Sequence, residues 1–250
     1  MKDRPPSPSA SRAVLFLRSL AFTLALFIIT PPYSFVVLAA FALPPLKRWR
    51  LISGWARMVM WLARVLLGLR YSVRGLEHLP REPAIILAKH QSAWETIAFQ
   101  CIFPPHVHVL KRSLLWIPFF GWALALMSPI AIDRGRARGA LKRMAERGTK
   151  RLEQGFWILV FPEGTRTRPG LRGTYHPGGA WLAARTGVPV VPVAHNAGLY
   201  WGKNAFLKRP GEIVVVIGEP LRPSGHTAEA LNQKVQTWIE SRMEALCPAA

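Results

Sequence analysis

The chain is poor in two kinds of residue whose scarcity is informative. Only two of its 250 residues are cysteine, Cys101 and Cys247, which excludes a disulfide framework and favours a reducing compartment. Asp and Glu number only 13 against 33 Lys and Arg, so the formal net charge is +20 at pH 7. A surface with so few acidic groups attracts nucleic acid, an acidic lipid leaflet or an acidic protein. The charge alone does not choose among these three.

The apolar composition favours a membrane among these anionic partners. Apolar residues make up 50% of the chain, and ten of them are tryptophan. Tryptophan is favourable at the boundary between lipid headgroups and hydrocarbon, and nucleic-acid-binding proteins seldom need so much apolar area. We therefore expect an anionic membrane surface as a partner and no nucleic acid.

A long segment near the N-terminus carries no charge. Residues 19–43 form an uncharged run of 25 residues, which as one helix would be about 37 Å long and could cross a hydrocarbon core of about 30 Å. Pro31-Pro32 divides the run into apolar halves, 20–30 and 33–43, and basic residues flank both ends, as on cytoplasmic flanks. We expect a helical hairpin that dips into one leaflet. A single span is the main alternative, and a secretory signal peptide is a weaker one.

These observations divide the chain into three parts. Residues 1–12 are rich in proline, serine and basic residues, which predicts a disordered basic tail. Residues 13–69 are expected to anchor the protein to a membrane. Arg57 and Arg64 are seven residues apart on one face of an apolar helix, which either lies in the membrane interface or packs on the globular domain. Residues 70–250 are expected to form that domain.

The globular part alternates strand-like and helix-like segments. Short apolar runs occur at 84–88, 128–132, 156–160, 188–194 and 213–217, and helical patterns occur at 137–154, 177–186 and 227–246. This alternation predicts an α/β fold with a layered sheet and helices. Prolines within 188–194 suggest an edge strand or a bulge. The apolar stretch 114–126, interrupted by Pro118 and Gly121, is expected to belong to the core or to the wall of an acyl-chain groove.

The segment Lys89-His90-Gln91-Ser92-Ala93-Trp94-Glu95 stands between two apolar segments and reads as a strand end, a loop and a helix start. Glu95 on the first helical turn can reach back to one ring nitrogen of His90, which then serves as a general base. The alternative is a capping box, in which Ser92 caps the helix and Glu95 binds the Ser92 backbone N–H. Spacing alone leaves both interpretations open.

A second motif follows another strand-like run. The apolar segment 156–160 leads directly into Phe161-Pro162-Glu163-Gly164-Thr165-Arg166-Thr167. Together with the histidine motif, this segment resembles the signature motifs of the glycerolipid acyltransferases, closest to the 1-acyl-glycerol-3-phosphate (lysophosphatidic acid) acyltransferases.

Two shorter segments strengthen the resemblance. Ile132-Asp133-Arg134 lies between the two motifs and 188–193 follows them, in the order of the family's second and fourth motifs. The similarity extends over roughly 75–218. The usual first motif ends in Asp, whereas this chain has Glu95, which is one methylene longer.

The resemblance implies an acyltransferase domain at 70–250 that transfers an acyl group from a thioester to the sn-2 hydroxyl of 1-acyl-glycerol-3-phosphate, giving phosphatidic acid for phospholipid biosynthesis. It implies that His90 accepts the hydroxyl proton and that Glu95 orients and supports the imidazole. The hydroxyl then attacks the thioester directly, which agrees with the lack of a Gly-x-Ser-x-Gly elbow.

The substrate ligands expected on this basis are mostly cationic, since guanidinium groups hold a phosphate monoester best. Glu163 is expected to orient an arginine or to bind a glycerol hydroxyl, and Gly164 is expected to permit a tight turn beside the ligand. The full set of expected substrate-binding residues is Lys111, Arg134, Glu163, Gly164, Thr165 and Arg166.

We expect neither a metal nor another cofactor, because His106-x-His108 without further ligands is a weak metal signal. The expected donor is an acyl-CoA or an acyl carrier protein thioester, and the expected acceptor is lysophosphatidic acid. The expected location is the inner, cytoplasmic membrane, with the catalytic domain facing the cytoplasm. The alternatives are an acyltransferase for another lysolipid, including an aminolipid, and a non-enzymatic basic module that binds membranes or nucleic acid.

Overall fold

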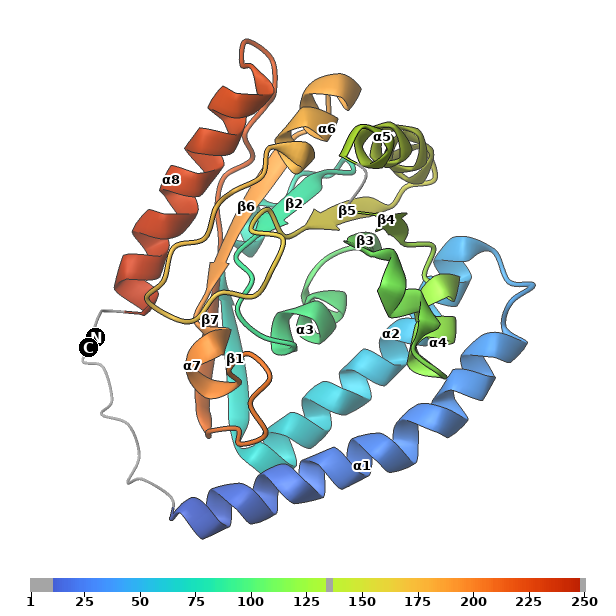
Figure 1. Cartoon of the computed structure of the whole chain (residues 1–250), viewed down its shortest axis with the longest axis vertical. Helices are drawn as coiled ribbons and strands as arrows, with labels where there is room; N and C mark the ends of the chain where they lie inside the picture. Colours follow the sequence, from blue (N-terminus) through green and yellow to red (C-terminus); the bar gives the residue numbers. More distant parts are fainter. Residues whose placement is uncertain (1–10, 134–136, 248–250) are drawn as a thin grey trace.

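The computed structural model describes residues 11–133 and 137–247 (Figure 1). The predicted basic tail therefore lies almost entirely outside the described residues, as does Arg134. The helices are α1 (Arg12–Ala39), α2 (Pro45–Leu62), α3 (Trp94–Ile102), α4 (Phe120–Leu126), α5 (Ala137–Glu153), α6 (Gly178–Thr186), α7 (Ala197–Tyr200) and α8 (Ala228–Leu246), with short helical turns η1 (Ala63–Leu67), η2 (Leu76–His78) and η3 (Arg112–Trp116). The strands are β1 (Leu69–Arg74), β2 (Ile85–Ala88), β3 (His106–Lys111), β4 (Ile130–Ile132), β5 (Trp157–Val160), β6 (Val190–His195) and β7 (Gly211–Ile217).

The strands form one seven-stranded sheet in the order β1-β7-β6-β2-β5-β3-β4. All neighbouring pairs are parallel except β6 with β7. At the centre, Leu87 of β2 is opposite Val160 of β5 on one side and Pro192 of β6 on the other. Because β2, β3, β4, β5 and β6 run in one direction, the segments that follow them meet at one edge of the sheet. The predicted α/β fold is confirmed.

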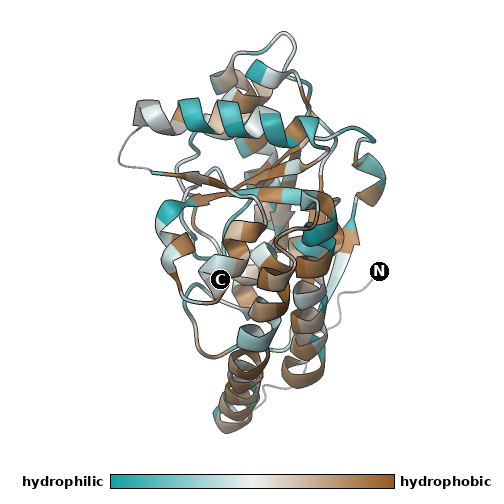
Figure 2. Ribbon diagram, turned by 90° about the vertical axis from the view of Figure 1, so that its right-hand side faces the viewer, coloured by the Kyte–Doolittle hydropathy of each residue, from teal (hydrophilic) through white to brown (hydrophobic). Residues whose placement is uncertain are grey.

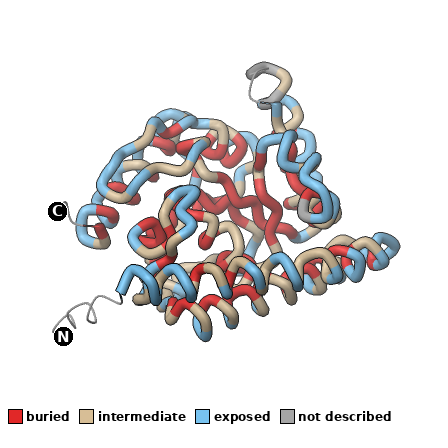
Figure 3. Tube along the Cα trace, turned by 60° about the horizontal axis from the view of Figure 1, so that its bottom comes forward, coloured by how far each residue is buried: buried red, intermediate tan, exposed pale blue. Residues whose placement is uncertain are grey.

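Helices cover both faces of this sheet. Helices α5, α6 and α8 pack on one face, and α1, α2 and α3 lie on the other. Strand β2 shows why: Ile85 and Leu87 belong to one apolar cluster, whereas Ile86 and Ala88 belong to the other. Successive side chains of a strand point to opposite faces, so a strand buried on both sides is apolar throughout. Figure 3 shows these strands as a buried layer between the helices.

The expected break at Pro31-Pro32 is wrong, because α1 runs without interruption through both prolines. Each proline removes one helical hydrogen bond. Contacts with α2 offset this loss: the Tyr33 hydroxyl donates to the Leu51 carbonyl at 2.6 Å, and Trp55 donates to the Thr30 hydroxyl at 3.3 Å. The chain reverses instead between α1 and α2. A helical hairpin does form, but its turn lies at 40–44, later in the sequence than Pro31-Pro32.

The expected edge position of the strand at 188–194 is also wrong, because β6 lies in the interior of the sheet between β7 and β2. Pro192 fits there because of where β7 ends. Its carbonyl accepts from the Gly218 N–H at 2.9 Å, one residue beyond β7. The missing N–H of Pro192 faces the same side, at the point where the pairing shifts by one residue. Val193 is opposite Ile217, but Val190 is opposite Leu221 and exchanges backbone hydrogen bonds with it at 2.9 and 2.8 Å. One extra residue of this kind is a bulge, the other alternative expected from the prolines.

Other expectations from the sequence pattern agree with the fold. The helix at 177–186 appears as α6 and ends at Gly187, which has the left-handed φ of 75°. The stretch 114–126 is interrupted, with η3 and α4 on either side of the break. The helical pattern at 137–154 appears as α5, whose buried side includes Met144, Ala145 and Leu152, whereas Leu141 is exposed. The division into an anchor at 13–69 and a domain at 70–250 stays a prediction, although β1 begins at Leu69.

Candidate functional site

The two sequence motifs form a single site at the carboxyl edge of the sheet. His90 follows β2, and Phe161 follows the neighbouring strand β5. Lys111 ends β3, the strand on the far side of β5. The tight packing of parallel strands therefore brings together residues that are far apart in the sequence.

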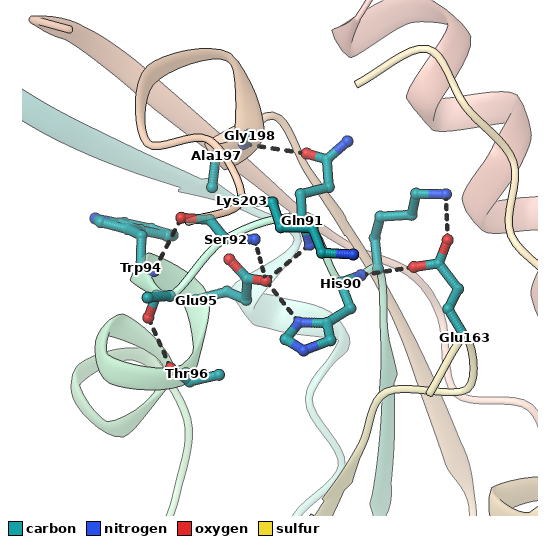
Figure 4. A network of polar contacts seen from close by, with 12 residues as sticks. His90, Gln91, Ser92, Trp94, Glu95, Thr96, Glu163, Ala197, Gly198 and Lys203 are labelled. Carbon is teal, nitrogen blue, oxygen red and sulfur yellow. Dashed lines mark hydrogen bonds and ion pairs between the residues drawn. The ribbon is translucent and has the colours of Figure 1, made fainter. Parts of the chain in front are cut away.

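His90 and Glu95 form a hydrogen-bonded pair (Figure 4). The Nδ1 atom of His90 lies 2.8 Å from Oε1 of Glu95, whose side chain is fully buried. Burial opposes ionisation of Glu95, but the hydrogen bonds from the His90 ring and the Ser92 N–H favour it, and the pKa of Glu95 is below its ordinary value. An ionised Glu95 fixes the proton of His90 on Nδ1. The other ring nitrogen, Nε2, is then available as a base.

The same carboxylate oxygen also organises the start of α3. Glu95 Oε1 accepts from the backbone N–H groups of Gln91 at 2.8 Å and Ser92 at 2.7 Å. The Ser92 hydroxyl accepts from the Trp94 N–H at 3.0 Å. The two interpretations of the motif are therefore not exclusive: Glu95 closes the helix start as a capping box does, and it holds the imidazole as a catalytic partner does.

The second motif clamps the backbone of His90 from both sides. The His90 N–H donates to Glu163 Oε2 at 2.9 Å, and its carbonyl accepts from the Thr167 N–H at 2.8 Å. The Phe161 ring stacks on the imidazole with ring centres 4.0 Å apart. Gly164 supplies the turn between these contacts with a left-handed φ of 67°, and its N–H donates to the Phe161 carbonyl.

A buried ionic cluster lies directly behind His90. The ammonium of Lys89 is 2.7 Å from Glu163 Oε1 and 2.8 Å from Glu240 Oε1 on α8. The Tyr175 hydroxyl donates to the same Glu240 oxygen at 2.8 Å. Burial, followed by the charges of Glu163 and Glu240, raises the pKa of Tyr175, so the phenol stays a donor. This cluster ties the C-terminal helix to the loop that carries His90.

His195 supports the same loop from the end of β6. It is fully buried, and burial lowers its pKa, so the ring is neutral. Its Nδ1 accepts from the Ala197 N–H at 3.3 Å, which leaves Nε2 to donate to the Lys89 carbonyl at 2.8 Å. Both backbone groups of Lys89 are thus occupied, since its N–H donates to the Val193 carbonyl at 2.9 Å.

A cavity of about 450 Å³ opens beside His90. Its polar end contains His90, Gly164, Thr165, Arg166, Lys111 and Lys203. Its apolar end lies between the helical hairpin and α4 and contains Val37, Ile52, Ala123 and Leu124, among others. A cavity that is polar at the base and apolar beyond it suits a molecule with a charged head and a hydrocarbon chain.

The structure brings most of the expected site residues to this cavity. Lys111, Gly164, Thr165 and Arg166 line it with His90, and Glu95 supports the ring from behind. Glu163 faces away from the cavity, toward Lys89 and the His90 backbone. Within the part of the chain that the structure describes, no group of three or more His, Cys, Asp or Glu side chains is placed to hold a metal ion.

Sequence reasoning missed the residues that support or complete the site from other segments. Lys89 was read only as part of the motif, and Glu240 and Tyr175 have no local pattern that points to a role. Lys203 lies outside every recognised motif. A charged residue at an otherwise fully apolar strand end, as Lys89 is after 84–88, is the one signal that could have revealed a buried ion pair.

A histidine–carboxylate pair at the carboxyl edge of an α/β sheet, beside a cavity with an apolar end, defines an enzyme site for acid–base chemistry on an amphipathic substrate. Comparisons with known proteins identify the family to which this chain belongs. The acyltransferase family model matches residues 70–196. A 1-acyl-sn-glycerol-3-phosphate acyltransferase from Pseudomonas aeruginosa is 48% identical over 210 residues, which cover 82% of this chain and 82% of that protein.

A more distant relative and a solved structure carry similar names. The 1-acyl-sn-glycerol-3-phosphate acyltransferase alpha of Mus musculus is 32% identical over 177 residues, covering 69% of this chain and 62% of that protein. The crystal structure of the 1-acyl-sn-glycerophosphate (LPA) acyltransferase from Thermotoga maritima has a TM-score of 0.78 at 23% identity, over 96% of this chain and 98% of that one, and supports the fold. The chain belongs to the acyltransferase family, which confirms the resemblance drawn from its motifs.

Proposed function

We propose that the protein transfers an acyl group from an acyl thioester to the sn-2 hydroxyl of 1-acyl-glycerol-3-phosphate and so produces phosphatidic acid. The observation that carries this proposal is the position of the His90–Glu95 pair, 2.8 Å apart, at the polar end of a cavity whose other end is apolar. The 48% identical relative named for this reaction supports the choice of acceptor.

The proposed chemistry follows from the geometry of the His90–Glu95 pair. His90 Nε2 removes the proton from the acceptor hydroxyl as its oxygen attacks the thioester carbonyl. Glu95 stabilises the imidazolium that forms, as a fully buried carboxylate at hydrogen-bond distance is suited to do. When the tetrahedral intermediate collapses, the carbon–sulfur bond breaks and the imidazolium returns its proton to the departing thiolate. No covalent acyl-enzyme is required.

The remaining cavity residues bind the two substrates. Arg166 and Lys111 are proposed to hold the acceptor phosphate. Thr165 and the Gly164 backbone line the same end of the cavity, where polar groups of the substrate meet the protein. Arg134 is proposed as a further phosphate ligand, although it lies outside the described residues. Glu163 acts through the loop rather than on the substrate, because its oxygens bind Lys89 and the His90 backbone.

The apolar end of the cavity is proposed to hold an acyl chain. Leu114 of η3 and Leu124 of α4 form one wall, and Tyr33 and Val37 of α1 form the other. The stretch 114–126 was expected to belong either to the core or to the wall of an acyl-chain groove. The side that faces the cavity favours the groove wall. The opposite side is part of the protein surface, since Trp116 is 77% exposed.

The helical hairpin is proposed to embed the protein in one leaflet. Helix α1 is long and apolar enough to cross a membrane, and one side of it contacts the rest of the chain near both ends. Near its start the Ser19 hydroxyl accepts from the Lys208 N–H at 3.0 Å, and near its end Phe35 contacts Phe119 with ring centres 6.0 Å apart. These contacts support a position of α1 along the domain in one leaflet rather than across the bilayer.

The outward face of α1 supports this arrangement. Phe27 is 74% and Ile28 71% exposed, and further exposed apolar side chains on the helix are Phe16, Leu17, Leu24 and Phe35. Figure 2 shows the apolar hairpin at one end of the molecule and the hydrophilic helix α5 at the other. We propose that the hairpin lies in the cytoplasmic leaflet of the inner membrane, where the basic surface meets anionic headgroups.

The donor is proposed to be an acyl-CoA or an acyl carrier protein thioester. Both present the acyl group as a thioester on a pantetheine arm and carry anionic groups that suit a chain of net charge +20. The direct test mixes purified protein with lysophosphatidic acid and either donor and follows thiol release. Release that depends on the acceptor and shows no initial burst is the expected result. Salt-sensitive DNA binding without release would support the non-enzymatic module instead.

A further inference from the structure

The connection from β6 to β7 forms a third wall of the active site that none of the sequence motifs includes. Residues 196–210 leave β6 at the carboxyl edge of the sheet, form α7 and turn back into β7. Lys203 and Asn204 in this connection line the same cavity as His90 and Arg166.

This connection is docked on the catalytic loop. The Gly198 N–H donates to Gln91 Oε1 at 3.2 Å, next to His90 in the first motif. A Cβ added to Gly198 would lie 2.9 Å from Pro169 and 3.0 Å from Gln91, so no larger residue fits without a shift. Close packing against the first motif therefore fixes where the following residues emerge (Figure 4).

A short turn then presents Lys203 to the cavity. The Ala205 N–H donates to the Gly202 carbonyl at 3.1 Å, and Asn204 has a left-handed φ of 56°, a conformation that asparagine tolerates well. The Lys203 ammonium points toward the second motif, with Nζ 3.5 Å from the Thr165 hydroxyl.

The cations around this end of the cavity are not neutralised. Among the residues that the structure describes, no carboxylate lies within 4.0 Å of Lys111, Arg166 or Lys203. The Nε atom of Arg166 is buried and has no hydrogen-bond partner in the described chain. Positive groups placed together without counter-charges repel one another, and an anionic ligand relieves that cost.

The reaction geometry indicates which anion arrives there. The attacking hydroxyl must reach His90, and only the C2–C3–O bridge of the glycerol separates that hydroxyl from the acceptor phosphate. The phosphate is therefore confined to the polar end of the cavity. The phosphates of a CoA donor are separated from the reacting thioester by the whole pantetheine arm, so they lie away from His90.

We propose that Lys203 binds the phosphate of the acceptor together with Arg166 and so selects phosphomonoester acceptors over uncharged ones. This assignment rests on the proposed function. Lys203 acts as a mobile point charge: the exposed ammonium, 3.5 Å from the Thr165 hydroxyl, can reach the phosphate without the fixed fork geometry of a guanidinium.

The test compares two acceptors with the same acyl chain, lysophosphatidic acid and the monoacylglycerol that lacks the phosphate, in detergent micelles. Lys203→Met should raise the KM for lysophosphatidic acid about tenfold, which corresponds to about 1.4 kcal/mol, with kcat changed less than about twofold. Its rate with monoacylglycerol should equal that of the wild type. Lys203→Arg should restore most of the affinity, and Lys150→Met, an exposed lysine on α5, serves as the matched control.

A comparison of two donors shows whether Lys203 binds the phosphate of the acceptor or a phosphate of CoA. The effect of Lys203→Met should be the same with acyl-CoA and with an acyl N-acetylcysteamine thioester, which has no phosphate. An effect seen only with acyl-CoA would assign Lys203 to the donor, and an equal loss with both acceptors would make it structural. Either result, or an unchanged KM for lysophosphatidic acid, overturns the role of Lys203 but leaves the proposed function intact. A wild type that does not acylate lysophosphatidic acid overturns the proposed function and this role with it.

Discussion

Glu240, near the end of the last helix, lies 2.8 Å from the ammonium of Lys89, the residue that precedes His90. The two residues are held together by the packing of α8 on the sheet, and both are almost fully buried. Glu240 lies beyond the segment 70–196 that the family model matches. A contact from outside the matched segment thus holds the loop that carries the proposed base, His90.

Removing the lysine should be far more costly than removing one of its partners. Lys89→Met leaves Glu163 and Glu240 buried without a cation, and breaking a buried ion pair in this way costs about 3–5 kcal/mol. Glu240→Gln leaves the Lys89–Glu163 pair intact and should cost less. Denaturant unfolding of both variants in detergent measures the difference. A Lys89→Met protein as stable as the wild type would show that the cluster contributes nothing to folding.

Arg166 should affect acceptor binding more than the chemical step. Arg166→Lys keeps the charge but loses the planar fork, so the KM for lysophosphatidic acid should rise by the equivalent of roughly 1 to 3 kcal/mol, with kcat nearly unchanged. Steady-state kinetics at a saturating donor concentration measures both quantities. An unchanged KM would remove Arg166 from the phosphate site.

His106, one of the two buried histidines of β3, should make stability depend on pH. Burial lowers the pKa of His106 to about 4, whereas in the unfolded chain it is near 6.5. Between these values the unfolded state binds the extra proton, so stability is lost as the pH falls from 6.5 toward 4, by about 1.4 kcal/mol per pH unit.

Replacing this histidine isolates its contribution. His106→Asn keeps a side chain that can donate to the Pro104 carbonyl, as His106 does at 2.9 Å, but it does not titrate. The free energy of unfolding, measured between pH 6 and 4.5, should therefore fall less steeply for the variant. Parallel curves for the two proteins would show that His106 is not buried in its neutral form.

The hairpin should anchor the protein without crossing the membrane. A tag at the N-terminus, just before α1, and a tag at the C-terminus, after α8, should both lie on the cytoplasmic side, because α1 contacts the domain both at Ser19 and at Phe35. Accessibility labelling in sealed vesicles is the measurement. Tags on opposite sides would establish a single span and contradict the packing of α1.

The sequence predicted the features that depend on neighbouring residues. The strands that precede the two motifs, the helix that ends at Gly187 and the positions of His90 and Arg166 in the loops after those strands all follow from local patterns. The break at Pro31-Pro32 was wrongly expected because the contacts of α1 with α2, which offset the missing hydrogen bonds, come from distant residues.

The rest of the site depends on contacts that no local pattern encodes. Glu240 meets Lys89 across 151 positions of sequence. Lys203 reaches the cavity only because Gly198 packs on Gln91. Whether Glu95 served as a cap or as the partner of His90 could not be decided from spacing, because one carboxylate oxygen does both.

The central claim, that Glu95 supports His90 electrostatically, is tested most directly by the turnover of Glu95→Gln at matched thermal stability. Glutamine keeps the length and the capping ability but removes the negative charge. Turnover should fall by about 10²-fold or more, within the range of general-base contributions, and Glu95→Asp should retain intermediate activity because the charge remains at a shorter reach. A Glu95→Gln protein that melts normally and turns over at nearly the wild-type rate would contradict the pair and leave Glu95 as a helix cap alone.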